Sequence, residues 1–328
     1  MKAILLKSFG NSDNLYLGET TKPIINNSEI LVKVKATALN RADILQREGK
    51  YPPPPGASEI LGLEMAGEVV EIGKNVTHWK VGDRVCGLLS GGGYAEFVSI
   101  PEALALAIPA NLSYVEAAAL PEVFLTAFQA VRLIADLQKG ETILIHAGAS
   151  GVGTAAIQLA QLFETEEIIV TASKGKHHTC LELGAHHAID YKSENFAERV
   201  QEITDTKGAN VVIDFLMAAY FQKNLEALAM DGRMVMLATL GGVKMSEANL
   251  LNILKKRLQI TGSTLRSRSL DYKTELTNAF KKEIWPHFET GELKPVIDTV
   301  FDWNDVAKAH QKMERNENVG KLVLEVTG

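Results

Sequence analysis

The sequence is poor in cysteine and contains no long hydrophobic run. Its 328 residues include two cysteines, Cys86 and Cys180, which argues against a disulfide framework and favours a reducing compartment. Two cysteines also exclude a four-cysteine zinc lobe within one chain. No stretch reaches the roughly 20 apolar residues of a membrane-spanning helix, and Lys7 interrupts the short apolar run at the N-terminus. We therefore expect a cytoplasmic protein that has no membrane partner.

A strong excess of charge of either sign is also absent. Lys and Arg total 34 against 40 Asp and Glu, so the formal net charge is −6. This balance gives no electrostatic reason to expect nucleic acid as a partner. The one basic cluster, residues 255–257 with Arg266 and Arg268, is typical of a solvated face.

The chain is long enough for two domains, and its pattern changes near residues 120 and 265. In residues 1–120, short strands separated by glycine and proline turns predict a barrel-like or sandwich-like domain, with strands at 30–36, 65–73, 81–85 and 94–98. In residues 121–265, strands alternate with helical patterns, which predicts an α/β fold with a doubly wound parallel sheet. The strands expected there are 142–145, 168–172, 188–191, 211–215, 233–238 and 258–263. The tail, residues 266–328, has a helical pattern at 272–283 and a strand pattern at 321–326, and we expect it to pack on the first domain.

A glycine-rich turn at residues 146–153 follows the strand at 142–145 and precedes a helix at 154–162. Strand, glycine turn and helix together are the setting of a dinucleotide-binding site. Glycines let the backbone approach the pyrophosphate, and the helix N-terminus offers unpaired N–H groups. The residues expected to contact the cofactor are Gly148, Ala149, Ser150, Gly151, Val152 and Gly153. The spacing is not the strict G-x-G-x-x-G, because Ser150 takes the middle position, and a tight turn without a ligand is the alternative.

The segment after the second strand of this domain indicates which cofactor binds. An NAD site usually places Asp or Glu about 20 residues past the glycines, on the ribose hydroxyl. Here the sequence reads Ser173, Lys174, Gly175, Lys176, with no acid between residues 170 and 176. A 2′-phosphate fits this composition, so we expect NADPH, with Lys174 and Lys176 competing for the phosphate. An ordinary solvated lysine pair is the alternative.

These motifs resemble the medium-chain dehydrogenase/reductase superfamily, and specifically its zinc-free, zeta-crystallin-like quinone oxidoreductases. Within that group the chain looks most like the stress-induced branch regulated by a tumour suppressor. The resemblance covers nearly the whole length and rests on residues 38–43, 51–56, 61–67, 146–153, 262–268 and 318–321. It implies a GroES-like catalytic domain made of residues 1–120 and 266–328, and a Rossmann domain made of residues 121–265. It also implies a homodimer joined through the edges of the Rossmann sheets.

The resemblance implies that no metal is bound. Zinc-dependent relatives carry histidine where this chain has Leu63, and their ligand cysteine lies near residues 40–43, where this chain has none. The histidines at 177, 178, 186 and 187 with Cys180 match no zinc spacing. Without a Lewis acid, an unactivated ketone is a poor substrate. An electron-poor quinone or conjugated enone delocalises the charge of an incoming hydride into its own oxygen.

The resemblance also implies the remaining site residues. It places Asn40 and Tyr51 in a cleft between the domains and, with Thr126, around the nicotinamide and the acceptor. Tyr191 resembles the tyrosine beside the adenosine phosphate, Gly241 and Gly242 would admit the nicotinamide end, and Asn318 is a further cofactor candidate. The alternatives are a turn residue for Asn40, a surface aromatic for Tyr51 and a core residue for Tyr191. One departure from the family is residues 217–219, Met-Ala-Ala, where the family usually has glycines.

The sequence thus predicts an NADPH:quinone oxidoreductase whose partner is a small-molecule quinone. The nearest alternative is an NADPH-dependent reductase of conjugated enones or enoyl thioesters. The other is a non-catalytic NADPH-binding protein, of the crystallin or RNA-binding kind.

Overall fold

A computed structural model describes residues 1–327, which form two compact units. The first comprises Met1–Leu125 and the chain from Leu265 onward, and the second comprises Thr126–Thr264. The predicted domain boundaries at residues 120 and 265 stay a prediction.

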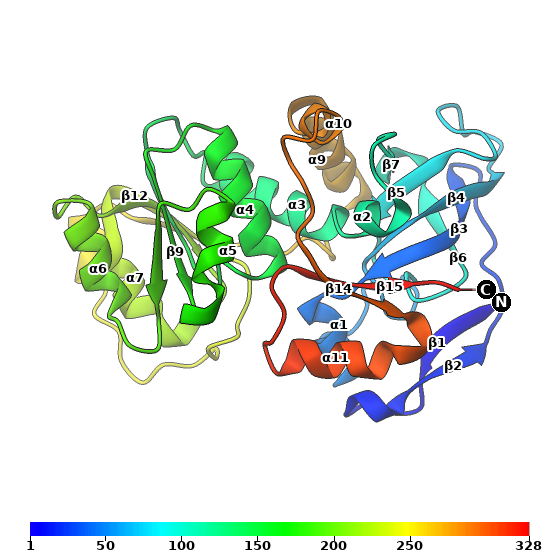
Figure 1. The fold of residues 1–328 in the computed structure, drawn as a ribbon, viewed down its shortest axis with the longest axis horizontal. Helices are drawn as coiled ribbons and strands as arrows, with labels where there is room; N and C mark the ends of the chain where they lie inside the picture. The colour runs from blue at the N-terminus through cyan, green and yellow to red at the C-terminus, as the bar shows by residue number, and fades with distance from the viewer. Residues whose placement is uncertain (328) are drawn as a thin grey trace. The chain divides into compact units, whose positions relative to one another are not determined.

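The first unit is built on a mainly antiparallel sheet to which the C-terminal segment returns (Figure 1). The order of its strands is β14-β15-β3-β4-β5-β7, and β6 also pairs with β3. The last strand, β15, pairs antiparallel with β3, while β14 runs parallel to β15. The strands are β3 (Glu29–Ala38), β4 (Glu64–Ile72), β5 (Arg84–Leu88), β6 (Phe97–Pro101), β7 (Ala105–Ala107), β14 (Ile297–Asp302) and β15 (Lys321–Glu325), beside a hairpin of β1 (Lys2–Leu6) and β2 (Leu15–Glu19).

Alternation along β3 explains the core of this unit. Ile30, Val32 and Val34 are buried on one face, against Val69 of β4 and Val85 of β5. Burial of such side chains contributes roughly 1.5–3 kcal/mol each. The helices of this unit are α1 (Arg41–Arg47), α2 (Tyr114–Ala118), α9 (Leu270–Glu283), α10 (Trp285–Glu289) and α11 (Val306–Glu314), and α3 (Pro121–Phe128) begins in it.

The second unit contains a six-stranded sheet in which every strand pairs in parallel. Across the sheet the order is β10-β9-β8-β11-β12-β13. Numbered along the chain within this unit, the strands therefore lie in the spatial order 3-2-1-4-5-6. This is the doubly wound order of dinucleotide-binding sheets and confirms the predicted parallel sheet. The strands are β8 (Thr142–Ile145), β9 (Glu167–Ala172), β10 (His187–Asp190), β11 (Ala209–Asp214), β12 (Leu228–Met236) and β13 (Gln259–Gly262).

Helices connect these strands, and the apolar residues between them form the core of the second unit. Leu144, Ile169, Val212 and Met234 from four neighbouring strands are buried in one cluster. The helices are α4 (Gly151–Leu162), α5 (His177–Glu182), α6 (Phe196–Ile203), α7 (Phe221–Ala227) and α8 (Leu251–Lys255), and a π-helical segment (Gln129–Ile134) continues from α3.

Two of the strands predicted in the first unit begin three residues later than expected. Val81 and Gly82 form a turn, with Gly82 at φ 94°, and β5 starts at Arg84. Tyr94 precedes β6 and is fully buried in a bend rather than alternating along a strand. Val81 is exposed in its turn, whereas Tyr94 is buried without belonging to a strand, so alternation alone does not locate where either strand begins.

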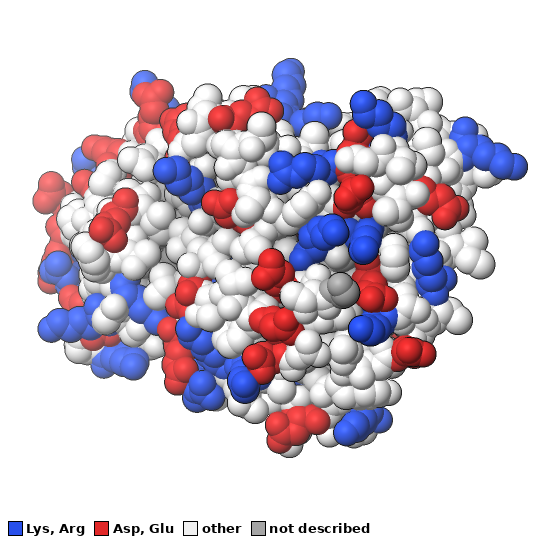
Figure 2. Space-filling model, turned by 45° about the vertical axis from the view of Figure 1, so that its right-hand side comes forward, with Lys and Arg blue, Asp and Glu red and all other residues white. Residues whose placement is uncertain are grey.

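The surface carries both signs of charge. On the face drawn in Figure 2, Lys and Arg side chains are interspersed with Asp and Glu rather than gathered into one basic patch. Across residues 1–327, no helix combines the length and the apolar character that crossing a bilayer requires. Both cysteines are buried free thiols.

Candidate functional site

The turn that follows β8 is held by short backbone contacts. Ala147 has φ 48°, in the left-handed region, and the Gly148 amide donates to the Thr171 carbonyl of β9 at 2.9 Å. Ser150 caps α4, because its Oγ accepts from the Gly153 amide at 3.0 Å. The first N–H groups of α4 therefore lie at the carboxyl end of β8, where such a sheet binds phosphate.

Packing within the protein, independently of any ligand, leaves no space for a side chain at Gly148 or Gly153. A Cβ on Gly153 would lie 2.3 Å from the Ala147 carbonyl oxygen, and one on Gly148 would lie 2.7 Å from the Val170 side chain. Backbone atoms cannot yield as a flexible side chain can. The glycines thus fix how closely α4 approaches the sheet.

The other cofactor residues predicted in this unit follow neighbouring strands. Ser173, Lys174 and Lys176 come directly after β9, Tyr191 comes after β10, and Gly241 and Gly242 follow β12. Because parallel strands end at the same edge of a sheet, this topology brings all of them to the edge that carries the turn after β8. Lys174 is exposed, while Lys176 is partly buried.

A buried histidine supports this edge from beneath, and the sequence analysis gave it no role. His146 directly follows β8 and is fully buried. Its Nδ1 lies 3.0 Å from the Thr171 hydroxyl and its Nε2 lies 2.7 Å from the Asn224 amide oxygen, which ties three elements together. Burial lowers the pKa of His146, which favours the neutral ring. A histidine directly after an apolar strand is the signal that could have found it.

In the loop after β11, a residue that is not glycine adopts a left-handed backbone conformation. Met217 has φ 50°, a conformation that costs a non-glycine residue roughly 1–2 kcal/mol. Asp214 holds it there, since its carboxylate accepts from the Leu216 and Met217 amides at 2.9 Å. The Gly241 amide donates to the Leu216 carbonyl at 3.0 Å, which fastens the loop after β12 to this one.

Replacing Gly153 by Ala tests the packing of the turn. We expect Gly153→Ala to lower the free energy of unfolding by about 1–3 kcal/mol, because its Cβ must displace backbone. Thermal unfolding measures the effect. Gly175→Ala is the matched control, since nothing lies within 4 Å of a Cβ there. Equal stability of the two variants would contradict the account.

In the first unit, a buried ion pair holds Asn40. Lys321 Nζ lies 2.6 Å from Glu64 Oε1, and both side chains are nearly inaccessible to solvent. The same ammonium donates to Asn40 Oδ1 at 2.7 Å, while Asn40 Nδ2 donates to Glu64 Oε1 at 2.9 Å and to the Ala38 carbonyl at 3.3 Å. Both Asn40 amide hydrogens are therefore used, whereas its oxygen can accept one more hydrogen bond.

A second network below Asn40 was not predicted. Asp43 is fully buried and accepts from the Asn40 and Gly62 amides at 2.8 and 3.1 Å, and from the Tyr94 hydroxyl at 3.3 Å. Burial raises the pKa of Asp43 to about 6, although the two amides oppose the shift. His310 Nε2 lies 3.3 Å from the Tyr94 hydroxyl, and burial lowers the pKa of this histidine to about 3.

Tyr51 lies beside the cation of Arg266 and near Glu122, an acid that is partly buried. The Arg266 guanidinium is 5.3 Å from the centre of the Tyr51 ring. Burial raises the pKa of Tyr51, nearby Glu122 adds to the shift and Arg266 opposes it. Burial, reinforced by Glu64, raises the pKa of Glu122 to about 8. Among residues 1–327 the Tyr51 hydroxyl has no hydrogen-bond partner, so it is available to a ligand.

The remaining predicted residues are more dispersed. Thr126 is partly buried on α3 and belongs to the second unit, whereas Asn318 belongs to the first and donates to the Gly320 carbonyl at 2.8 Å. Leu63 is buried in the core. The part of the chain that the structure describes holds no group of three His, Cys, Asp or Glu placed to bind a metal ion.

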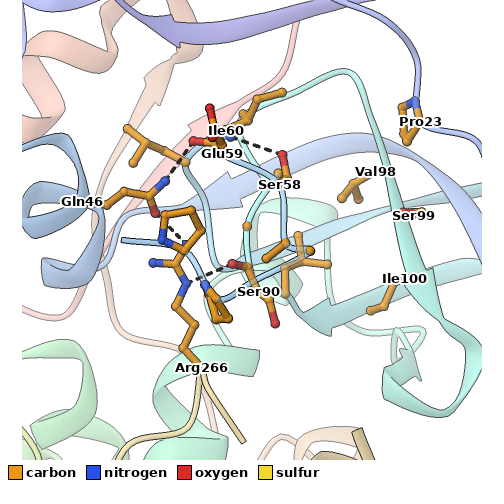
Figure 3. A pocket seen from close by; sticks show the side chains of 18 of the residues that line it. Pro23, Gln46, Ser58, Glu59, Ile60, Ser90, Val98, Ser99, Ile100 and Arg266 are labelled. Atoms are coloured by element: carbon orange, nitrogen blue, oxygen red, sulfur yellow. Dashed lines mark hydrogen bonds between the residues drawn. The ribbon is translucent and has the colours of Figure 1, made fainter. Parts of the chain in front are cut away.

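One interpretation of the charges is wrong. Arg266 is not part of a solvated basic face: it is buried in the first unit, while residues 255–257 belong to the second. It lines a groove of about 1490 Å³ between the β1–β2 hairpin, the proline loop at 52–55 and the segment 266–273. Figure 3 shows Arg266 extending toward Gln46 and Ser90 in this groove. Asn40, Tyr51 and Glu122 do not line it.

Replacing Lys321 tests the buried ion pair. We expect Lys321→Met to lower the free energy of unfolding by about 3–5 kcal/mol, because Glu64 stays buried without its cation. Urea unfolding measures it. Lys308→Met, which breaks the exposed pair with Asp305, is the control and costs less than about 1 kcal/mol. A similar loss of unfolding free energy in both variants would show that the buried ion pair stabilises the fold no more than the exposed one.

Comparison with known proteins assigns the family. The zinc-binding dehydrogenase family matches residues 151–282, and the alcohol dehydrogenase GroES-like domain matches residues 26–110. A quinone oxidoreductase-like protein 2 homolog from Nematostella vectensis is 33% identical over 92% of this chain and 82% of its own length. The chain belongs to the medium-chain dehydrogenase/reductase family. The human synaptic vesicle membrane protein VAT-1 homolog is 30% identical over 99% of this chain and 86% of its own length.

Solved structures of this family superpose over nearly the whole chain. A Pseudomonas syringae quinone oxidoreductase is 31% identical with a TM-score of 0.87, and the CurK enoyl reductase is 29% identical with a TM-score of 0.89; each comparison covers 99% of both chains. A mycobacterial protein complexed with NADPH is 26% identical, with a TM-score of 0.89, over 99% of this chain and 100% of that one. The first unit of this medium-chain dehydrogenase/reductase is thus its GroES-like part, and the parallel sheet is its Rossmann-like, nicotinamide-dinucleotide-binding part.

Proposed function

We propose that the protein reduces quinones with NADPH and does so without zinc. The observation that carries the choice of cofactor is the segment after β9, where Ser173, Lys174 and Lys176 stand and no carboxylate does. In the proposed complex the turn at 148–153 binds the pyrophosphate, and this segment binds the 2′-phosphate. Tyr191 then flanks the adenosine, and the loop at 241–242 and Asn318 contact the rest of the cofactor.

The acceptor class follows from the side chains that replace a zinc site. Leu63, which is 1% exposed, stands where zinc-dependent relatives carry histidine, and leucine cannot be a ligand. The acceptor must therefore take up hydride without Lewis-acid help, as a quinone does. In the overall reaction a quinone, NADPH and a proton give hydroquinone and NADP⁺. Similarity to quinone oxidoreductases supports this choice.

Three residues are proposed to contact the reacting groups. The Tyr51 hydroxyl donates a hydrogen bond to the oxyanion that develops on the acceptor. Asn40 accepts from a ribose hydroxyl, because both of its amide hydrogens are already used within the unit. Thr126 supplies a further polar contact.

Reduction of a conjugated enone or enoyl thioester is the second candidate. Similarity to the CurK enoyl reductase over 99% of both chains favours it. The carbonyl of an enone also collects negative charge when hydride adds to its β carbon, so the same Tyr51 donor serves both reactions.

Steady-state oxidation of NADPH decides between the candidates. We expect 1,2-naphthoquinone to support turnover with a kcat/KM at least about tenfold above that of a simple conjugated enone, and a metal chelator to leave the rate unchanged. Faster turnover of the enone would replace the quinone by the second candidate. NADPH binding with neither acceptor reduced would indicate a non-catalytic binding protein.

Removing the Tyr51 hydroxyl tests its proposed role. We expect Tyr51→Phe to lower kcat/KM for the quinone about 10–100-fold, since one hydrogen bond to a charged group contributes about 1.5–3 kcal/mol. Tyr114→Phe, at the start of α2 and outside the groove, is the matched control. If both variants keep the wild-type kcat/KM, Tyr51 is not the donor.

We also propose a homodimer formed through the β13 edge of the second unit. This strand pairs with β12 alone among the strands of its sheet, and three of its four residues are exposed. Large apolar side chains are exposed in the segment before it: Met230, Leu240, Val243, Leu250, Leu251 and Leu254. An open edge beside exposed apolar residues is typical of a surface that another chain covers.

A charge in this surface should separate the protomers. Leu254 is 79% exposed, so Leu254→Glu leaves the fold intact while placing a carboxylate in the proposed interface. We expect it to shift the mass measured by light scattering from dimer to monomer. Leu181→Glu, on the exposed face of α5, is the control and stays dimeric. A monomeric wild type, or a dimer that survives Leu254→Glu, would contradict the proposal.

A further inference from the structure

Two buried cations in the wall of the groove have only neutral partners. Arg266 is 5% exposed and Lys273 is 6% exposed. The guanidinium donates to the Ser90 carbonyl at 2.9 Å, the Gln46 amide oxygen at 2.7 Å and the Tyr51 carbonyl at 3.4 Å. The ammonium donates to the Ser90 hydroxyl at 2.8 Å and to the Arg266 carbonyl at 2.7 Å. No carboxylate among the described residues lies within 4.0 Å of either group.

This arrangement differs from the other deeply buried cations of the first unit. Arg47 contacts Glu314 and Lys321 contacts Glu64, as buried charges generally require. Asp43 is the acid that raises the pKa of Arg266 most, and Glu122 is the acid that raises the pKa of Lys273, but neither carboxyl group forms a hydrogen bond or an ion pair with these cations. Arg266 and Lys273 therefore differ from Arg47 and Lys321 in having no carboxylate in direct contact.

We propose that Arg266 and Lys273 bind an anionic oxygen group, a carboxylate or a phosphate, on a ligand that enters the groove. Three of the five guanidinium N–H groups and two of the three ammonium N–H groups are used internally, which leaves two and one for the ligand. A guanidinium fork beside an ammonium suits the oxygens of such a group.

The surrounding structure holds the two cations in place. Lys273 lies in the first turn of α9, and its bond to the Arg266 carbonyl fixes the backbone between them. Gln46, which accepts from Arg266, is itself anchored because its amide donates to the Glu59 carbonyl at 2.9 Å (Figure 3). The groove of about 1490 Å³ exceeds what a free anion needs, so it has room for the larger molecule that carries the group.

Titration calorimetry with inorganic phosphate tests the site. Saturating NADP⁺ fills the sheet-edge site first, and ionic strength is held constant with chloride. We expect saturable phosphate binding that Lys273→Gln and Arg266→Gln weaken at least about tenfold and that Lys273→Arg retains. Lys256→Gln is the matched control, because Lys256 also donates only to carbonyls but lies in the second unit. If Arg266→Gln does not fold, the comparison of Lys273→Gln with Lys273→Arg decides the test.

Repeating the titration without NADP⁺ in a Lys174→Ala, Lys176→Ala background keeps the result independent of the proposed function. No saturable binding in either format, or binding that is unchanged in both Lys273→Gln and Arg266→Gln, would overturn the proposal.

A kinetic comparison then identifies the source of the anion. If the anionic group belongs to the substrate, Lys273→Gln raises KM for a sulfonated naphthoquinone about tenfold and leaves KM for 1,2-naphthoquinone unchanged. If a separate ligand supplies it, phosphate binds to the wild type without competing with either quinone.

Discussion

The close approach of α4 to the parallel sheet is the constraint on which the nucleotide-binding part of this protein depends. Gly153 permits it, because any side chain there would meet the Ala147 carbonyl oxygen. Ser150 then caps the helix, and its free N–H groups face the edge at which β9, β10 and β12 also end. His146, held between β9 and α7, keeps the end of β8 in place beneath them. The loops after β8, β9, β10 and β12 thus meet at one edge of the sheet, where we propose that the cofactor binds.

The first unit depends instead on a buried charge. Glu64 of β4 accepts from Lys321 of β15 and Asn40 at the start of α1, and its second oxygen accepts from the Glu122 amide at 2.9 Å. A carboxylate with these partners joins segments that are far apart in the sequence. Burial, reinforced by this Glu64, raises the pKa of Glu122 to about 8. Arg266 and Lys273 have no such carboxylate partner and donate only to neutral groups.

Sequence reasoning succeeded where local pattern determines structure. A short apolar run followed by glycines predicts β8 at 142–145. A buried parallel strand and the glycine turn after it are both encoded within a few consecutive residues. It failed where long-range contacts decide. The basic neighbours of Arg266 in the sequence predict a solvated face. In the structure, however, Arg266 is buried and donates to Ser90 and Gln46. The contact between Tyr94 and His310 likewise joins residues 216 positions apart. Met217 stands where the family usually has glycine, but only the structure shows its left-handed backbone.

The measurement that tests the central claim most directly is the equilibrium binding of NADPH and NADH to the wild-type protein, followed by nicotinamide fluorescence. A 2′-phosphate that meets Lys174 and Lys176 gains charge-assisted hydrogen bonds of about 1.5–3 kcal/mol, so the Kd of NADPH is expected to be at least about tenfold lower. The two cofactors should bind equally when both lysines are replaced by Ala. Tighter binding of NADH by the wild type, or a preference for NADPH that survives the double replacement, would contradict the account.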